Sequence, residues 1–233
     1  METALYLIPV PLGESPLERV LPSYNVEVIR GIKFFIVENV RSARRFLKKC
    51  DKTIDIDGIT FYTLDEHTRQ EDITGYLDPL LAGSPMGVIS EAGCPAVADP
   101  GSDVVAMAQA RGLKVIPLVG PSSILLSLMA SGFNGQSFAF NGYLPVEAAK
   151  RTRKFREMER CIDAGQTQIF IETPYRNNKL IADICASVRK NLRLCVACDV
   201  TCDGESVVTH AVGDWCRMKY DYNKRPAIFL LYR

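Results

Sequence analysis

Between an apolar strand and a helix, the chain reads Ser90-Glu91-Ala92-Gly93-Cys94-Pro95-Ala96-Val97-Ala98-Asp99-Pro100-Gly101. This segment combines turn-forming glycines and prolines with two acids. A strand is predicted over Met86–Ser90 before it, and a helix over Ser102–Arg111 after it. Ligands of parallel α/β sheets bind just beyond the carboxyl ends of the strands, so this loop is expected to lie at a binding site.

The rest of the chain repeats the order of strand and helix, which predicts βαβ units. Further strands are predicted at Leu5–Ile8, Phe34–Val37, Lys114–Leu118, Phe138–Asn141, Thr167–Ile171, Leu192–Val200, Glu205–His210 and Ala227–Tyr232. Further helices are predicted at Arg41–Lys49, Asp72–Leu81, Ser122–Ser131, Glu147–Ile162 and Asn177–Lys190. Because the last strands are joined compactly, the C-terminal half is expected to hold a mixed sheet. The sequence thus predicts an α/β protein with a mainly parallel N-terminal sheet.

The composition is that of an ordinary soluble protein. The chain has 233 residues, of which 47% are hydrophobic, and its net charge is +1. Met1-Glu2-Thr3 is acidic where a signal peptide would be basic, and no apolar run approaches the roughly 20 residues of a membrane span. The eight cysteines are therefore predicted to be reduced thiols of a cytoplasmic protein. Cys195, Cys198 and Cys202 lack a second ligand pair at zinc spacing, so no metal site is expected.

The glycines exclude two common nucleotide-binding loops. None of the 16 glycines is followed by another glycine two positions later. The dinucleotide fingerprint G-x-G-x-x-G is therefore absent, and so is the phosphate-binding G-x-x-x-x-G-K-[ST]. An ordinary Rossmann dehydrogenase, an ATPase and a GTPase are all disfavoured.

Three more loops follow predicted strands and resemble the first in their small residues, at Pro9–Gly13, Val119–Ser123 and Glu172–Arg176. Such loops present backbone N–H and C=O groups without bulky side chains. Each loop taken alone is also consistent with ordinary turn chemistry. Four of them at the same edge of a sheet favour a binding cleft.

Five segments together resemble the tetrapyrrole methylase superfamily of S-adenosylmethionine-dependent methyltransferases. They are, in this order and spacing, Leu5–Gly13, Ser90–Gly101, Pro117–Ser123, Gly142–Pro145 and Ile169–Arg176. Within the superfamily they are most similar to the branch that methylates a ribose 2′-hydroxyl of small-subunit ribosomal RNA. The resemblance covers nearly the whole chain, and the combination of motifs is specific.

The resemblance implies a homodimer of two-domain subunits that hold S-adenosylmethionine in a cleft between the domains. Sequence alone would place the boundary near Asn141–Lys150, whereas the family pattern implies domains of residues 1–116 and 117–233. The residues implied to contact the cofactor are Pro11, Gly13, Glu91, Gly93, Cys94, Val97, Ser122, Ser123, Thr173, Val200, Pro226 and Ala227. The branch usually has aspartate where this chain has Glu91.

The chain departs from the branch pattern in three places. The branch carries an acid followed by Asp-Thr-Arg after the second strand, and this chain has Glu38-Asn39-Val40-Arg41. It usually shows Lys-Gly-Glu before the last strand, and this chain has Lys224-Arg225-Pro226. The sequence also ends at that strand, without the further helical segment of many members. These departures leave the acceptor open.

Transfer of a methyl group to a hydroxyl requires alignment of the reacting atoms and removal of a proton. Glu172, at a predicted strand end, is a candidate base, and Glu38 with Arg41 forms a second candidate catalytic site. A base at Glu172 predicts that Glu172→Gln abolishes transfer. The alternative is that Glu172 only pairs with Arg176.

An RNA acceptor would have to be bound by local positive charge, because the net charge is close to zero. The first basic cluster comprises Lys150, Arg151, Arg153, Lys154, Arg156 and Arg160. The second comprises Arg41, Arg44, Arg45, Lys48 and Lys49. Both clusters are also consistent with ordinary solvent-exposed helix faces.

The function predicted from the sequence is S-adenosylmethionine-dependent methylation of RNA. Two alternatives stay open. One is methylation of a ring carbon in a tetrapyrrole or corrin precursor, and the other is a module that binds the cofactor without turnover. A basic rim beside the site favours RNA, and a deep apolar trough favours a porphyrinoid.

Overall fold

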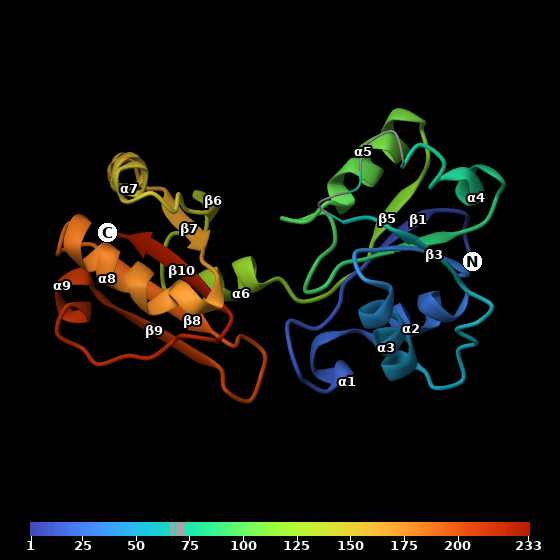
Figure 1. Ribbon diagram of the computed structural model, residues 1–233, viewed down its shortest axis with the longest axis horizontal. Coiled ribbons are helices and arrows are strands. Elements are labelled where there is room, and N and C mark those ends of the chain that lie inside the picture. The colour runs from blue at the N-terminus through green and yellow to red at the C-terminus, as the bar shows by residue number, and fades with distance from the viewer. Residues whose placement is uncertain (66–67, 69–72) are drawn as a thin grey trace. The chain divides into compact units, whose positions relative to one another are not determined.

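The chain folds into two compact units, Met1–Ser122 and Ser123–Arg233, which we call the N-terminal and C-terminal units (Figure 1). The computed structural model describes residues 1–65, 68 and 73–233. The resemblance places the domain boundary between residues 116 and 117. In the structure Pro117 ends β5, which pairs with β1, so the N-terminal unit extends to the loop that follows.

The N-terminal unit contains a parallel sheet of order β3-β2-β4-β1-β5. Its strands are β1 (Leu5–Ile8), β2 (Phe34–Val37), β3 (Thr60–Thr63), β4 (Met86–Ile89) and β5 (Val115–Pro117). All four pairings are parallel, so every strand ends at the same edge. The central strands read LYLI, FFIV and MGVI, the continuous apolar runs that a sheet covered on both faces requires.

Helices cover both faces of this parallel sheet. α2 (Ser23–Arg30) and α3 (Val40–Cys50) pack against Tyr6, Ile8 and Phe35, with α1 (Leu17–Val20) beside them. α4 (Asp78–Leu81) and α5 (Gly101–Ala110) pack against Leu5 and Met86 on the other face. Because β1 alternates its side chains between the two cores, it fixes the central layer of the unit.

The C-terminal unit contains the expected mixed sheet, of order β6-β7-β10-β8-β9. Its strands are β6 (Phe138–Tyr143), β7 (Thr167–Ile171), β8 (Arg193–Cys198), β9 (Ser206–Ala211) and β10 (Ala227–Tyr232). β6 and β7 are parallel, and the other three pairings are antiparallel. The carboxyl ends of β6, β7 and β8 therefore meet the start of β10 at one edge.

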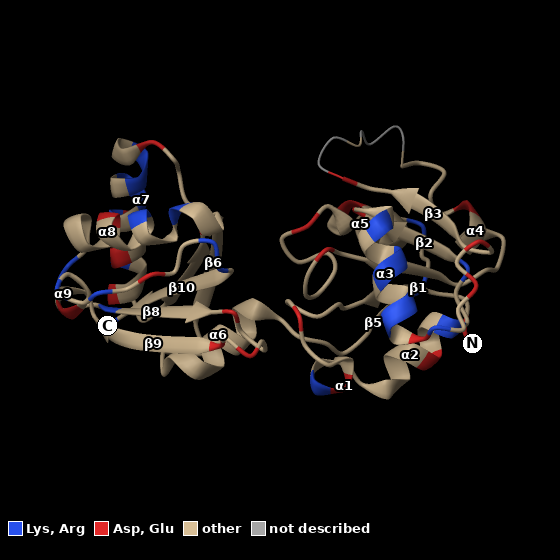
Figure 2. Cartoon of the chain, turned by 60° about the horizontal axis from the view of Figure 1, so that its bottom comes forward, with Lys and Arg blue, Asp and Glu red and all other residues tan. Residues whose placement is uncertain are grey.

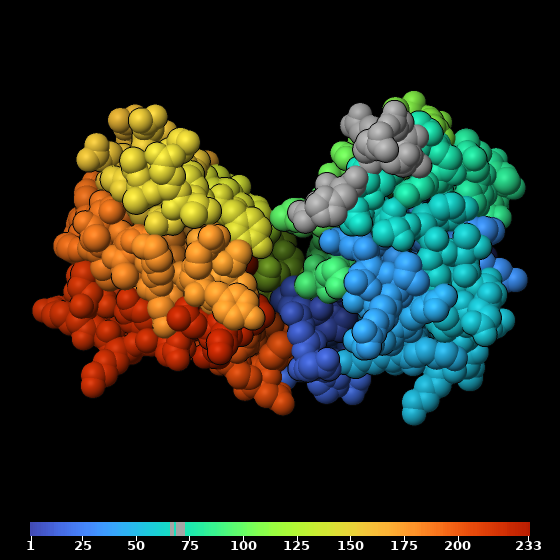
Figure 3. Space-filling model, in the orientation of Figure 1, coloured from blue at the N-terminus to red at the C-terminus, as the bar shows by residue number. Residues whose placement is uncertain are grey.

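Helices also cover both faces of the mixed sheet. α7 (Ala148–Asp163), α8 (Asn177–Ser187) and α9 (Val212–Trp215) pack on one face around Phe155, Phe170 and Trp215. α6 (Ser123–Ser131) packs on the other face against Cys195 and Leu230. A 3₁₀ turn, η1 (Pro174–Arg176), joins β7 to α8. The atoms of α7 (yellow) adjoin those of α8 (orange) on the surface of this unit (Figure 3).

Several local predictions differ from the structure. β3 was not predicted, since its exposed threonines leave it with the weak pattern of an edge strand. α1 and α2 were also missed; each starts directly after a proline and is short. The helix expected over Asp72–Leu81 is reduced to α4, and its expected start at Asp72 lies outside the described residues.

The cysteines on β8 are part of the core. Cys195 and Cys198 are buried, and burial raises the pKa of each thiol to about 11. Such thiols are protonated and unreactive at neutral pH. In the part of the chain that the structure describes, no three potential metal ligands gather, and no helix is long and apolar enough to cross a membrane.

Candidate functional site

Three loops of the N-terminal unit are joined at the carboxyl edge of its sheet. Val10 and Gly93 exchange backbone hydrogen bonds, with N···O distances of 2.9 and 3.2 Å, and so connect the loops after β1 and β4. The Cys94 thiol lies 3.4 Å from the carbonyl oxygen of Pro121 in the loop after β5. The loops predicted to form a binding site are therefore packed together, as their common strand direction requires.

The loop after β4 is held in a strained conformation by Asp99. Ala96 and Ala98 have φ angles of 64° and 60°, which residues with a Cβ rarely adopt. Asp99 Oδ1 accepts hydrogen bonds from the backbone N–H groups of Ala96 and Gly101, at 2.8 and 2.7 Å. Burial raises the pKa of Asp99 in spite of these bonds. Strain of this kind persists where surrounding contacts enforce it, which is common at ligand sites.

Glu38 and Glu91 form an acidic pair at the ends of β2 and β4. Glu38 Oε1 accepts a hydrogen bond of 3.2 Å from the backbone N–H of Glu91, and Glu91 Oε2 accepts one of 3.0 Å from Ser42 Oγ. Burial raises the pKa of Glu38, and the nearby Asp99 and Glu91 raise it further. Glu38 therefore holds a proton to higher pH than an ordinary carboxyl group, which suits proton transfer.

The raised pKa of Glu38 predicts how stability depends on pH. Above its ordinary value of 4.5, the folded state binds more protons at this site than the unfolded state. The unfolding free energy therefore falls as the pH rises through the raised pKa. We expect Glu38→Gln to remove part of this fall in urea titrations between about pH 4 and 7. Identical pH profiles for the two proteins would contradict the assignment.

A groove of about 250 Å³ lies between the loop after β1 and helix α3. Three of the residues expected to contact the cofactor, Pro11, Gly13 and Glu91, line it. Arg45 and Lys49 of α3 line the same groove and make one wall cationic. Of the other expected contacts, Gly93 and Cys94 lie in the joined loops, Val97 is 51% exposed, and Ser122 and Ser123 lie where the two units divide.

The remaining expected contacts belong to the C-terminal unit, where loops at one edge of the mixed sheet are also joined. The backbone N–H of Asp199 donates to Pro226 O at 3.0 Å, and that of Lys224 donates to Pro174 O at 2.8 Å. Arg225 Nε donates to Asp199 Oδ2 at 2.7 Å. Thr173, Val200, Pro226 and Ala227 thus share this edge.

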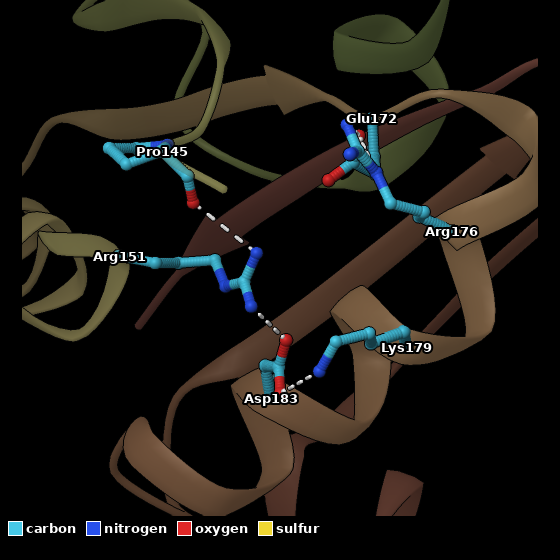
Figure 4. Close-up of polar contacts among 6 residues, drawn as sticks. All are labelled: Pro145, Arg151, Glu172, Arg176, Lys179 and Asp183. Carbon is cyan, nitrogen blue, oxygen red and sulfur yellow. Dashed lines mark hydrogen bonds and ion pairs between the residues drawn. The ribbon is translucent and has the colours of Figure 1, made fainter. Parts of the chain in front are cut away.

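Glu172 holds the turn after β7. Its side chain is only 2% exposed, and Oε1 accepts a hydrogen bond from Thr173 N at 2.7 Å. The same oxygen accepts one from Arg176 Nη2 at 2.7 Å (Figure 4). Arg176 Nε donates to the same oxygen at 3.0 Å. This is the arrangement of a positioning residue, so the alternative of a pair with Arg176 describes Glu172 better than a free base.

One cation of the basic cluster on α7 is buried in the core instead of exposed on the surface. Arg151 is buried, pairs with Asp183 at 2.7 Å and donates to the Pro145 carbonyl at 3.3 Å (Figure 4). Lys150 pairs with Glu147 at 2.8 Å. Arg151 was therefore wrongly counted as a surface cation, because the sequence does not show which side of the helix faces α8. Arg153, Lys154, Arg156 and Arg160 remain on the outer side.

Similar proteins share both the sequence pattern and the fold. Ribosomal RNA small subunit methyltransferase I of Vibrio cholerae is 31% identical over 182 residues, 77% of this chain and 59% of the relative. The protein of that name from Streptococcus pyogenes is 31% identical over 78% of this chain and 60% of its own length. The crystal structure of the methyltransferase CobJ matches 99% of this chain and 94% of its own, with a TM-score of 0.64 and 14% identity. That of diphthine synthase matches 98% and 89%, with a TM-score of 0.68 and 14% identity.

The chain thus has the fold of these two methylase structures and resembles the two ribosomal RNA methyltransferases in sequence. It spans about 60% of the length of the two ribosomal RNA methyltransferases named above. No family model matches it. The resemblance therefore rests on sequence similarity over 182 residues and on the fold.

The first departure from the branch pattern, at Asn39, has a structural explanation. Asn39 stands where the ribosomal RNA branch has aspartate, and its side chain accepts hydrogen bonds from the backbone N–H groups of Arg41 and Ser42 at 2.9 and 3.2 Å. Asparagine and aspartate cap helices about equally well. The start of α3, and with it the position of Arg41, is therefore preserved.

Two features of the site were not predicted. Asp99 was noted as an acid, but its role in holding the loop depends on backbone groups two and three residues away. The Asp-Pro-Gly sequence before α5 was the available signal, since aspartate accepts such bonds in turns. The wall that α3 adds to the groove was not predicted, because α3 lies about 30 residues or more along the chain from the other lining segments.

Proposed function

We propose that this protein is an S-adenosylmethionine-dependent methyltransferase that modifies a ribose 2′-hydroxyl of small-subunit ribosomal RNA. The sequence similarity to ribosomal RNA small subunit methyltransferase I from several bacteria carries the proposal. The strained, hydrogen-bonded loop at the carboxyl edge of the parallel sheet supports it, because such loops bind ligands in α/β proteins. The proposal includes a cytoplasmic homodimer.

The residues at this edge fit S-adenosylmethionine, which supplies a methyl group on a positively charged sulfur. Gly93 has a φ of 73°, and a Cβ there would lie 3.2 Å from Leu12 Cδ2. Because residue 93 has no side chain, the loops after β1 and β4 can approach each other closely at this point. Backbone groups of the loops after β1 and β4 would bind the polar parts of the cofactor, and Val97 and Cys94 its apolar parts. Ser122, Ser123, Thr173, Val200, Pro226 and Ala227 are proposed as further contacts.

We propose Glu38 as the group that takes the proton from the acceptor hydroxyl. Its raised pKa brings it closer to neutrality than an ordinary carboxyl group, and its hydrogen bond to the Glu91 backbone fixes its orientation. Arg41, at the first turn of α3, would orient the acceptor. The loops would align the hydroxyl, the methyl carbon and the sulfur for in-line displacement.

Glu172→Gln is expected to leave methyl transfer within a few-fold of the wild type. Glutamine keeps an acceptor oxygen for Thr173 N and Arg176, so the turn should hold at a cost of about 1 kcal/mol of unfolding free energy. Initial rates of transfer and urea unfolding of both proteins check this. Abolished transfer with unchanged stability and unchanged cofactor affinity would instead make Glu172 the base.

The proposed function is tested with radiolabelled S-adenosylmethionine and small ribosomal subunits from a strain of the source organism that lacks this gene. A uroporphyrinogen-type acceptor is run in parallel. Label in the RNA, mapped to a ribose, is the expected result. Label only in the tetrapyrrole would replace the proposal by carbon methylation, and cofactor binding without any transfer would indicate a binding module.

A further inference from the structure

The outer face of α3 carries a row of exposed cations. Its inner residues Ala43, Phe46 and Leu47 are buried, and the helix contains no aspartate or glutamate. Figure 2 shows positive charge along the length of α3. The exposed cations are Arg41, Arg44, Arg45, Lys48 and Lys49.

These like charges repel one another within the helix. Arg41, Arg45 and Lys49 follow at intervals of four residues, a spacing at which like charges destabilise a helix. Within residues 1–65, 68 and 73–233, Lys49 alone of the α3 cations has an ion pair, to the exposed Glu14 at 3.5 Å. On α7, by contrast, Lys150 and Arg151 are both paired with carboxylates. Of the two basic helices, α3 is the one with no acidic residue of its own.

Two of these cations line the groove beside α3, next to the loops at the carboxyl edge of the sheet. Arg45 lines the groove, and its guanidinium forms no hydrogen bond or ion pair with the part of the chain that the structure describes. Lys49 also lines the groove and donates to the Ser15 carbonyl at 3.1 Å. The two carboxylates of the groove are held by neighbours, Glu14 by Lys49 and Glu91 by Ser42 Oγ.

The size of the groove limits what it can hold. Its volume of about 250 Å³ is below the roughly 300–1,000 Å³ of pockets that enclose a whole small-molecule ligand. A phosphate group with its sugar has a volume of the right order for this groove. Arginine binds phosphate through paired N–H groups, and Arg45, whose guanidinium has no partner among the described residues, is available for such a contact.

We propose that Arg45 binds a phosphate of the acceptor RNA in the groove beside α3, and that the exposed α3 cations bind the phosphates that follow. This inference rests on the proposed function and assigns the RNA-positioning surface to this helix. Arg41, Arg45 and Lys49 are separated by about 6 Å along the helix axis, comparable to the spacing of successive phosphates on a strand. Arg45 acts on the position of the acceptor and takes no part in the displacement.

The test compares Arg45→Gln with Arg153→Gln, which removes an exposed cation from α7. Binding of small ribosomal subunits from the gene-deleted strain is measured at several salt concentrations, together with cofactor affinity and the KM and kcat of transfer. Arg45→Gln is expected to raise the KM for the subunits about tenfold with kcat largely kept. It should also lower the salt slope by about 0.7 to 0.9, and leave cofactor affinity unchanged. Arg153→Gln should change the KM less than about twofold.

Two results would overturn the inference. Equal losses in both variants would show that attraction to RNA is spread over the surface. If Arg45→Gln bound RNA as the wild type does, with or without weaker cofactor binding, Arg45 would not bind an RNA phosphate in the groove. Failure of the proposed function can be told apart from failure of this inference, because the wild-type protein would then transfer no methyl group to the subunits. Arg45→Lys, which keeps the charge, should recover part of the affinity but not the paired contact.

Discussion

Asp99→Ala is expected to weaken the binding of S-adenosylmethionine by at least tenfold and to destabilise the N-terminal unit. The variant leaves the backbone N–H groups of Ala96 and Gly101 without their acceptor, while Ala96 and Ala98 keep unfavourable φ angles. Loss of two hydrogen bonds to a carboxylate corresponds to about 2 to 4 kcal/mol. Isothermal titration with the cofactor and urea unfolding of the full chain measure the two effects.

Asp99→Asn is the matched control, because it keeps an oxygen at the position of Oδ1 and removes only the charge. Burial already disfavours that charge and raises the pKa of Asp99. We therefore expect Asp99→Asn to retain most of the affinity and stability. If both variants bound the cofactor as the wild type does, the loop after β4 would have no part in the binding site.

Gly120→Ala is expected to destabilise the N-terminal unit by about 3 kcal/mol, which is about 10 °C in melting temperature for a unit of this size. A Cβ at this position would lie 2.2 Å from Pro9 Cβ and 2.6 Å from Pro9 Cγ. The proline ring is rigid, so the loops after β1 and β5 would have to move apart. Calorimetry of the full chain measures the shift, and cofactor titration should show weaker binding as the loops separate.

Gly135→Ala provides the control for this change. Nothing lies within 4 Å of a Cβ built at Gly135, and its φ is not in the left-handed region. The substitution should therefore leave the melting temperature within about 1 °C. A Gly120→Ala protein as stable as Gly135→Ala would mean that the two loops accommodate the methyl group, and that their close approach does not contribute to the site.

Glu38 and Glu172 look alike in the sequence but have different surroundings in the structure. Both are acids directly after apolar strands, and the sequence proposed both as catalytic. In the structure Glu172 is enclosed by its own turn and by Arg176, four residues away. Glu38 instead lies beside Asp99 and Glu91, which come from a distant part of the chain. Burial raises its pKa most, and these two acids raise it further. The roles differ because of neighbours that local patterns do not contain.

The sequence by itself determined the α/β class, most of the strands and the mixed sheet of the C-terminal half. Hydrophobic runs, proline and glycine act over a few residues, and the strand order that they imply places the loops at one sheet edge. It also supplied the resemblance that the similar proteins bear out. Such features depend on neighbours along the chain.

Only the tertiary structure decided which charges are free to act. Arg151 and Arg45 look alike in the sequence, yet the first is buried against Asp183 and the second lines an open groove without a partner among the described residues. The tertiary structure also decides that the Ala96 N–H donates to Asp99 and that Gly120 approaches Pro9 too closely for a Cβ to fit without a shift. Burial and pairing are set by which helix face meets which strand, and that is fixed by packing between segments far apart in the chain.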